Sequence, residues 1–233
     1  EAGHLRPVCD AATALGTAVV FGCIERPSDR GGHSVYASLV YIDATGNIRS
    51  VHRKLMPTYE ERLSWSPGDA HGLRTHPVGP FTVGGLNCWE NWMPLARTAL
   101  YAQGEDLHVA IWPGGMHNTP DITRFIARES RSYVISVCGV LRRRDIPDGL
   151  PQVDLLRESL PDVIANGGSC IAAPDGSWVA APLPEEERVI VATLHHARVR
   201  EERQNFDAVG HYGRPDVLQL VVNRERQGVA RFT

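Results

Sequence analysis

Short apolar runs alternate with amphipathic stretches along the chain, and turn residues separate them. Apolar runs of strand length that are rich in β-branched and aromatic residues predict β-strands. These runs cover residues 17–24, 34–42, 48–54, 79–88, 107–113, 133–141 and 189–194, with a further strand-like run at 217–222. Helical periodicity predicts helices at 91–103, 119–132 and 195–206, and the segment before Gly16 has a helical pattern as well. The alternation of strands and helices favours an α/β fold.

Turn residues between the strands indicate that the sheets are mixed rather than wholly parallel. The stretch 43–47 (DATGN) predicts a tight turn between the second and third strands. A hairpin that turns at Asp175 and Gly176 is predicted within 169–180. Because hairpins join antiparallel strands, we expect the first three strands to form a meander and the later ones to include antiparallel pairs.

Composition and charge exclude several classes of protein. The 233 residues suit one large domain, and 42% hydrophobic with 22% charged residues is an ordinary globular balance. A formal net charge of −3 argues against a general nucleic-acid binder, which would carry clustered Lys and Arg. No apolar run is long enough to cross a bilayer and no signal-peptide pattern opens the chain, so neither a membrane nor a nucleic-acid partner is expected.

The cysteines do not form a pattern typical of disulfides or of zinc sites. They are odd in number, widely spaced and never arranged as CxxC. They are Cys9, Cys23, Cys88, Cys138 and Cys170. We therefore expect a reducing, cytoplasmic location. His52, His108, His117 and His211 lack metal-ligand spacing, and each is interpreted as structural or local.

Cys88 has the position of a reactive thiol, because it ends a predicted strand and precedes a predicted helix. A thiol at a helix N-terminus meets unpaired backbone N–H groups and the positive end of the helix dipole, which favour the thiolate. The same N–H groups could hold an anion that develops on a substrate. Most free cysteines are small buried hydrophobes, and position alone leaves both interpretations open. The other cysteines lie inside apolar strands or a helix and are interpreted as structural.

Three other residues are weak signals when taken singly. Lys54 closes a strand before a loop that contains proline, and the adjacent Glu60 and Glu61 are typical of a solvated surface. Only one side chain of such a pair can point inward, since neighbouring side chains diverge.

Taken together, the motifs resemble the nitrilase branch of the carbon–nitrogen hydrolase superfamily. The resemblance begins with HRKLMPTYEERLSWSPGD and GGLNCWENWMPLARTALYAQGE. It continues through HVAIWPG and GGSCIAAPDGSWVAAPL to VGHYGRPDVLQLVVN, so it covers nearly the whole chain. It implies a single domain over residues 1–233 with an α-β-β-α sandwich of two mixed β-sheets and outer helices.

The resemblance also assigns roles to individual residues. Cys88 matches the family nucleophile, Lys54 the catalytic lysine and Glu61 the second glutamate of the site. The tripeptide CWE separates nitrilases from amidase and carbamoylase relatives. The implied reaction is hydrolysis of a nitrile to a carboxylic acid and ammonia through a thioimidate and a thioester, and this chemistry needs no metal or organic cofactor. Trp89, Glu90 and Trp112 are the residues expected to bind substrate, although core packing explains Trp112 equally well.

One departure from the family pattern concerns the general base. Family members carry this glutamate in an FPE-type motif, on a strand that comes before the segment resembling GTAVVFGCIER. Only fifteen residues precede that segment here, and none forms FPE. Glu1 and Glu25 are the acids nearby, and neither has the right context. We therefore expect the first strand–helix–strand unit to be missing from this chain, and its activity to be impaired.

Partners and alternatives follow from the same resemblance. The implied partners are a small-molecule nitrile and further copies of the chain, in a homodimer or a larger spiral. One alternative is an amide or carbamoyl hydrolase of the same superfamily, since substrate class depends on the pocket. Another is an inactive truncated copy that acts only in assembly. A nucleotide-binding domain is excluded because no GxGxxG or GxxxxGK[ST] follows any strand.

Overall fold

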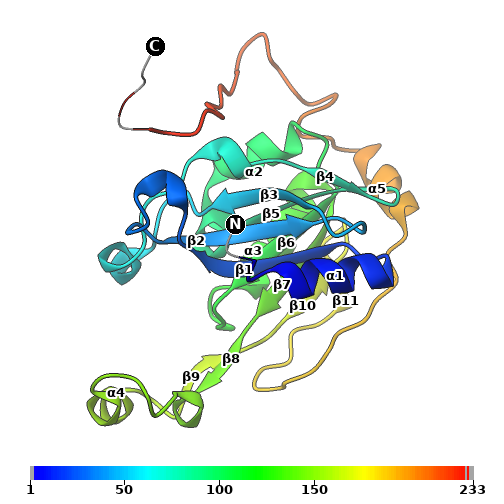
Figure 1. The fold of residues 1–233 in the computed structure, drawn as a ribbon. Helices are drawn as coiled ribbons and strands as arrows, with labels where there is room; N and C mark the ends of the chain where they lie inside the picture. The colour runs from blue at the N-terminus through cyan, green and yellow to red at the C-terminus, as the bar shows by residue number, and fades with distance from the viewer. Residues whose placement is uncertain (1–2, 229, 231–233) are drawn as a thin grey trace. The chain divides into compact units, whose positions relative to one another are not determined.

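The computed structural model describes residues 3–228 and 230, which form two compact units (Figure 1). The first unit comprises Glu1–Ile111 and Phe206–Thr233, and the second comprises Trp112–Asn205. None of the described helices is long and apolar enough to span a membrane.

The first sheet of the first unit is the predicted meander. It contains β1 (Val19–Glu25), β2 (Tyr36–Ile42) and β3 (Ile48–Arg53). Both β1 and β3 pair with β2 in antiparallel fashion, and Val40 lies opposite Phe21 on one side and Val51 on the other. The turn forms as expected, because the Asp43 carboxylate accepts hydrogen bonds from the backbone N–H groups of Thr45 and Asn47.

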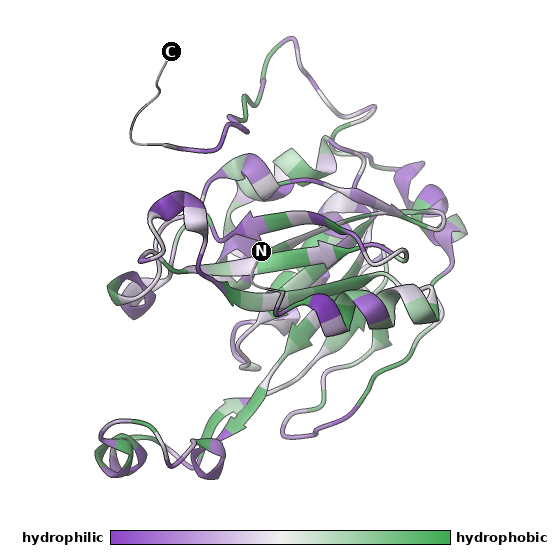
Figure 2. Ribbon diagram, in the orientation of Figure 1, coloured by the Kyte–Doolittle hydropathy of each residue, from purple (hydrophilic) through white to green (hydrophobic). Residues whose placement is uncertain are grey.

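Helix α1 (Arg6–Leu15) covers one face of this meander. Its Ala12 packs with Val40 and Ile42 of β2, which share a face because they are two residues apart. The helix ends at Gly16, whose positive φ of 58° suits a glycine C-cap. Figure 2 shows the central strands in the hydrophobic colour and α1 with hydrophilic bands, as expected for a helix with one face in solvent.

The second sheet of this unit faces the meander. It contains β4 (His76–Val78), β5 (Phe81–Asn87) and β6 (Leu107–Trp112), with β4–β5 antiparallel and β5–β6 parallel. The Tyr41 ring stacks on the His76 ring with centroids 4.0 Å apart, and a Cβ on Gly22 would lie 3.2 Å from Ile111 Cγ2.

Helix α2 (Pro94–Tyr101) covers the other face of β5, where Leu100 packs against Leu86. The layers of this unit are therefore helix, sheet, sheet and helix, which is the predicted sandwich.

The second unit contains the predicted hairpin. Strand β7 (Tyr133–Cys138) pairs with β10 (Cys170–Ala172), which pairs with β11 (Trp178–Ala180), both in antiparallel fashion. Helix α3 (Pro120–Ser130) packs on β7, and Thr123 Oγ1 lies 2.6 Å from Ser136 Oγ. This unit also contains the strands β8 (Val140–Arg142) and β9 (Val163–Asn166) and the α-helices α4 (Val153–Ser159) and α5 (His196–Arg203).

Two predicted strands, at 189–194 and 217–222, are wrong. Both segments lack strand pairing, and Val191 and Leu218 are 90% and 80% exposed. A strand needs a neighbouring edge to bond to, and periodicity alone cannot reveal whether one is present. In the second segment Leu220 and Val222 instead pack beside the cluster of β5 and α2.

The predicted helix at 91–103 begins later than expected. Residues Cys88–Trp92 form a short 3-10 helix, and α2 starts at Pro94. Met93 has an extended backbone, with φ −81° and ψ 106°, because the residue before a proline is driven out of the helical region. The run at 133–141 is likewise divided into β7 and β8 at Gly139.

Candidate active site

The candidate thiol lies at a sharp junction between β5 and the short helix Cys88–Trp92. Strand β5 ends at Asn87, and Cys88 itself adopts φ 53°, in the left-handed region. A residue with a Cβ is disfavoured there by about 1–2 kcal/mol. Strained residues of this kind cluster at functional sites, where they present a side chain at a tight strand-to-helix turn.

The Cys88 thiol is buried, with 8% of the residue exposed. Burial raises the pKa of this thiol above its ordinary value of 9.0. The positive charge of Lys54 and the backbone N–H of Trp89 oppose this effect and lower the pKa, whereas Glu61 and Glu90 raise it. The position at a helix start predicts an acidic thiol, but desolvation outweighs that influence. The resting group is therefore mostly protonated near neutral pH.

Lys54 is held at the end of β3 by a carboxylate and a hydroxyl. The residue is 2% exposed, and its Nζ donates to Glu61 Oε2 at 2.5 Å and to Thr58 Oγ1 at 3.2 Å. Glu61 lies in the short 3-10 helix Tyr59–Leu63, and the same Oε2 accepts the Thr58 backbone N–H at 2.6 Å. Glu60 is exposed. The structure thus brings together Lys54 and Glu61, and the lysine charge acts on the Cys88 sulfur.

Glu90, two residues after the thiol in the chain, is almost fully buried, with 1% exposed. Its Oε1 accepts the backbone N–H of Leu55 at 2.6 Å, and its Oε2 accepts the backbone N–H of Asn87 at 2.9 Å. His52 Nε2 lies 3.1 Å and 3.2 Å from the two oxygens. These contacts are all with protein groups, so a role for Glu90 in binding substrate stays a prediction.

A buried chain of side chains supports the junction from the other side. Asn91 Nδ2 donates to the backbone carbonyls of Cys88 at 2.8 Å and Leu86 at 3.3 Å. Asn91 Oδ1 must then accept from His108 Nε2, which is 2.8 Å away. His108 Nδ1 lies 2.9 Å from Glu105 Oε1. Sequence reasoning missed this chain, and the sole signal was an Asn three residues after the cysteine.

The tryptophans expected to bind substrate differ in their surroundings. Trp89 is 49% exposed, next to the candidate thiol in the chain. Trp112 opens the second unit and is 5% exposed, and its indole N–H donates to Ser136 Oγ at 3.4 Å. Substrate binding by either residue stays a prediction.

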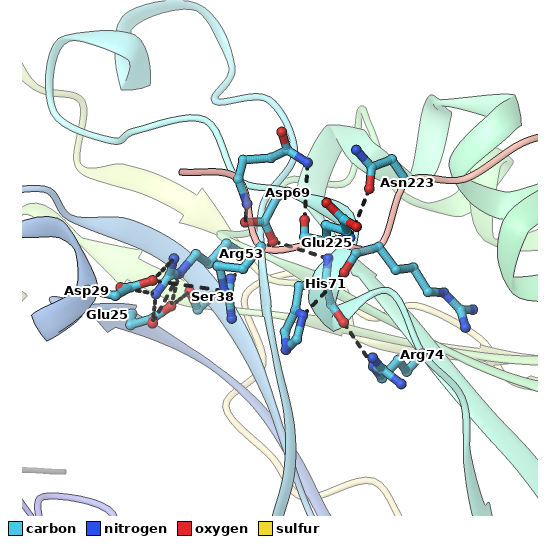
Figure 3. Close-up of polar contacts among 12 residues, drawn as sticks. Glu25, Asp29, Ser38, Arg53, Asp69, His71, Arg74, Asn223 and Glu225 are labelled. Atoms are coloured by element: carbon cyan, nitrogen blue, oxygen red, sulfur yellow. Dashed lines mark hydrogen bonds and ion pairs between the residues drawn. The ribbon is translucent and has the colours of Figure 1, made fainter. Parts of the chain in front are cut away.

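Glu25, which is not expected to be the general base, is held by its neighbours (Figure 3). Its carboxylate accepts from Ser38 Oγ at 2.7 Å and from Arg53 Nη2 at 2.8 Å, and Arg53 also donates to Asp29 at 2.9 Å. Arg53 directly precedes Lys54, so this ion pair stabilises the strand end that carries the lysine. Glu1 lies outside the described residues.

The C-terminal segment contacts a loop near the same strand end (Figure 3). The Asp69 carboxylate accepts from Arg226 Nη1 and from the Gln227 backbone N–H, both at 3.1 Å. His71 Nδ1 lies 3.3 Å from the Arg224 carbonyl oxygen. Asp69 is buried, so these bonds satisfy a carboxylate that would otherwise be costly to bury.

This arrangement combines a buried thiol, a paired ammonium group and a backbone N–H. Such a set suits attack by sulfur on a polarised carbon, with the ammonium group stabilising negative charge that develops on the atom bonded to that carbon.

Sequence comparison matches the chain to a protein family and to named relatives. A protein-family model described as carbon-nitrogen hydrolase matches residues 2–204. Nitrilase 2 of Arabidopsis thaliana is 38% identical over 92% of this chain, and an aliphatic nitrilase of Sinorhizobium fredii is 36% identical over 94%. The chain spans 63% of the length of the first relative and 68% of the second.

Solved structures show the same fold at lower identity. A carbon-nitrogen hydrolase from Helicobacter pylori is 18% identical, with a TM-score of 0.65 over 92% of this chain and 75% of that one. A mutant amidase from Nesterenkonia sp. AN1, with acrylamide added to its active-site cysteine, is 16% identical. Its TM-score is 0.64, over 86% of this chain and 72% of that one.

Proposed function

Because the chain belongs to the carbon–nitrogen hydrolase family, we propose that it acts on the carbon–nitrogen bond of a nitrile, which it converts to a carboxylic acid and ammonia. The observation that carries the proposal is the Lys54 ammonium group, buried against Glu61 at a site where its charge lowers the Cys88 thiol pKa. The CWE tripeptide and the named nitrilases among the relatives favour a nitrile over an amide.

The first stage is addition of the Cys88 sulfur to the nitrile carbon. Because burial raises the pKa of this thiol, it starts out protonated and must lose its proton as the carbon–sulfur bond forms. Lys54 gives a proton to the nitrile nitrogen and takes up the proton from sulfur, so the net transfer runs from sulfur to nitrogen. The product is a neutral thioimidate, and the ammonium group stabilises the charge that builds on nitrogen in the transition state.

The second stage consumes two water molecules. One adds to the thioimidate carbon and ammonia leaves, which gives a thioester; the other releases the carboxylic acid and restores the thiol. Each water needs a carboxylate base. Glu61 and Glu90, whose charges act on the thiol, are both engaged by N–H groups, and Glu61 also by Lys54. We therefore expect this stage to be slow and covalent intermediates to accumulate on Cys88.

The proposal is tested by the mass of the covalent intermediate. The chain is mixed with short aliphatic and aromatic nitriles and with the matching amides, and intact protein mass and free ammonia are followed over time. A nitrile is expected to add its full mass as a thioimidate before the acyl form appears. An amide can add only its mass less ammonia.

Labelling by amides alone would overturn the nitrile proposal in favour of an amide hydrolase. Absence of any adduct or ammonia with both classes would support a non-catalytic protein. The matched control is C88A, which lacks the sulfur and whose folding is checked by circular dichroism.

A further inference from the structure

Glu90 connects the two strand ends that carry the candidate reacting residues. One carboxylate oxygen accepts the N–H of Leu55, which follows Lys54, and the other accepts the N–H of Asn87, which precedes Cys88. Strand β3 ends at Arg53 in one sheet and β5 ends at Asn87 in the other. A single buried side chain therefore joins the two sheets next to the lysine and the thiol.

We propose that Glu90 is a positioning residue of the reaction. It holds the Lys54 ammonium group and the Cys88 sulfur in their relative positions by accepting a backbone N–H next to each of these residues. The inference rests on the proposed function. It replaces the substrate-binding role expected for Glu90, because both carboxylate oxygens are engaged by the protein and the residue is 1% exposed. A group without a free oxygen or access to the surface is poorly placed to bind a nitrile.

His52 fixes the orientation of the Glu90 carboxylate. Its Nε2 lies between the two oxygens, so this nitrogen carries the proton and donates. Its Nδ1 is buried and has no hydrogen-bond partner among the described residues. The histidine thus makes its polar contacts through one nitrogen, toward the carboxylate.

The charge of Glu90 and its geometry act on the thiol in opposite directions. The negative charge raises the pKa of the Cys88 thiol, which disfavours the nucleophile. If charge were its main influence, neutralising Glu90 would make the thiol more reactive. If positioning dominates, the same change makes the site less reactive, because an amide presents one acceptor where the carboxylate presents two. The sign of the effect therefore separates the two roles.

The experiment compares E90Q with E60Q in the full chain. Glu60 is exposed in the short 3-10 helix Tyr59–Leu63, so E60Q makes the same charge change without the bridge. We expect E90Q to slow Cys88 acylation at saturating nitrile by about 10- to 100-fold, with little change in the half-saturating concentration, since small displacements of reacting groups have effects of this size. Acylation by a folded E90Q as fast as wild type, or faster, would overturn the proposal.

A second readout does not depend on the nitrile. The thiol pKa is obtained from the pH dependence of iodoacetamide labelling, with and without K54M, in the wild-type and E90Q backgrounds. If Glu90 positions Lys54 next to Cys88, K54M raises the thiol pKa in the wild-type background and raises it much less in the E90Q background. Equal increments in both backgrounds would contradict positioning even if no nitrile reacts, whereas unequal increments without nitrile acylation would reject only the proposed function.

A pair of histidine variants covers the case in which E90Q does not fold. H52L removes the donor to the carboxylate, and H52Q keeps one. We expect the nitrile to acylate Cys88 more slowly in H52L than in wild type, and H52Q to recover most of the lost rate. Equal rates for the two variants would show that the orientation of Glu90 does not matter.

Discussion

The ends of β3 and β5 both present a candidate reacting side chain, but they hold it by different means. At the end of β3, Lys54 is a buried charge that is paired with Glu61 and Thr58. At the end of β5, Cys88 is a neutral thiol on a left-handed backbone, held through its carbonyl by Asn91. The Lys54 ammonium group therefore carries its positive charge before the reaction begins, whereas the Cys88 sulfur becomes charged only when its proton moves.

Removing the sulfur gives the largest expected effect. C88A is expected to lose nitrile labelling and ammonia release, a fall of at least about 10³-fold, because a nucleophile has no substitute in covalent catalysis. Intact-mass analysis and an ammonia assay measure the loss. Residual ammonia release above background in C88A would place the chemistry on another residue.

Removing the Lys54 charge gives the next largest expected effect. K54M is expected to slow Cys88 acylation by about 10²–10³-fold, the loss typical of one electrostatic stabiliser of a developing anion. It should also raise the thiol pKa, since the lysine charge lowers it. Single-turnover acylation and the pH profile of labelling measure the two effects. A K54M variant with unchanged thiol pKa would show that the two strand ends are not coupled.

Alkaline pH is expected to weaken the protein through its buried thiols. Burial raises the pKa of Cys88, and that of Cys138 and Cys170 to about 12 and about 11. The folded chain then binds more protons than the unfolded chain above the ordinary thiol value of 9.0, so stability falls as pH rises from there through the folded pKa values. Thermal melts at about pH 8 and about pH 10 measure this, and C88A should lose less stability than wild type over the same interval.

The backbone strain at Cys88 gives the smallest expected effect. C88G removes the Cβ from the left-handed conformation, whereas C88A retains it. We expect the free energy of unfolding of C88G to exceed that of C88A by about 1 kcal/mol. The greater conformational entropy of glycine in the unfolded chain reduces this difference. Urea denaturation of the two variants measures the difference. A less stable C88G would mean that the left-handed turn carries little strain.

Sequence reasoning predicted the layers better than the details of the site. Strand periodicity located β3 and β5, and therefore the two positions where the chemistry is proposed. It placed a strand at 189–194 that does not form, because an apolar run does not reveal whether an edge lies beside it. The left-handed Cys88 could not be predicted either, since cysteine disfavours that conformation and the Asn91 side chain that bonds its carbonyl is itself held by the distant His108.

The pKa of the thiol shows the same limit of local rules. A cysteine at a helix start is expected to be acidic, and the Trp89 N–H does lower its pKa. Burial depends on packing from distant segments, and it raises the pKa by more. The resemblance implies a substrate-binding role for Glu90, and it gives no sign of the contacts that Glu90 makes with Leu55 and His52, more than thirty residues earlier.

The central claim is that the Cys88 sulfur attacks a nitrile with the help of the Lys54 charge. The most direct test is to mix the chain with a reactive nitrile, quench the reaction at short times and map the covalent adduct by peptide mass spectrometry. The account predicts an adduct of the full nitrile mass on the peptide that contains Cys88, absent in C88A and strongly delayed in K54M. An adduct on another cysteine, or ammonia release while Cys88 stays unmodified throughout, would contradict it.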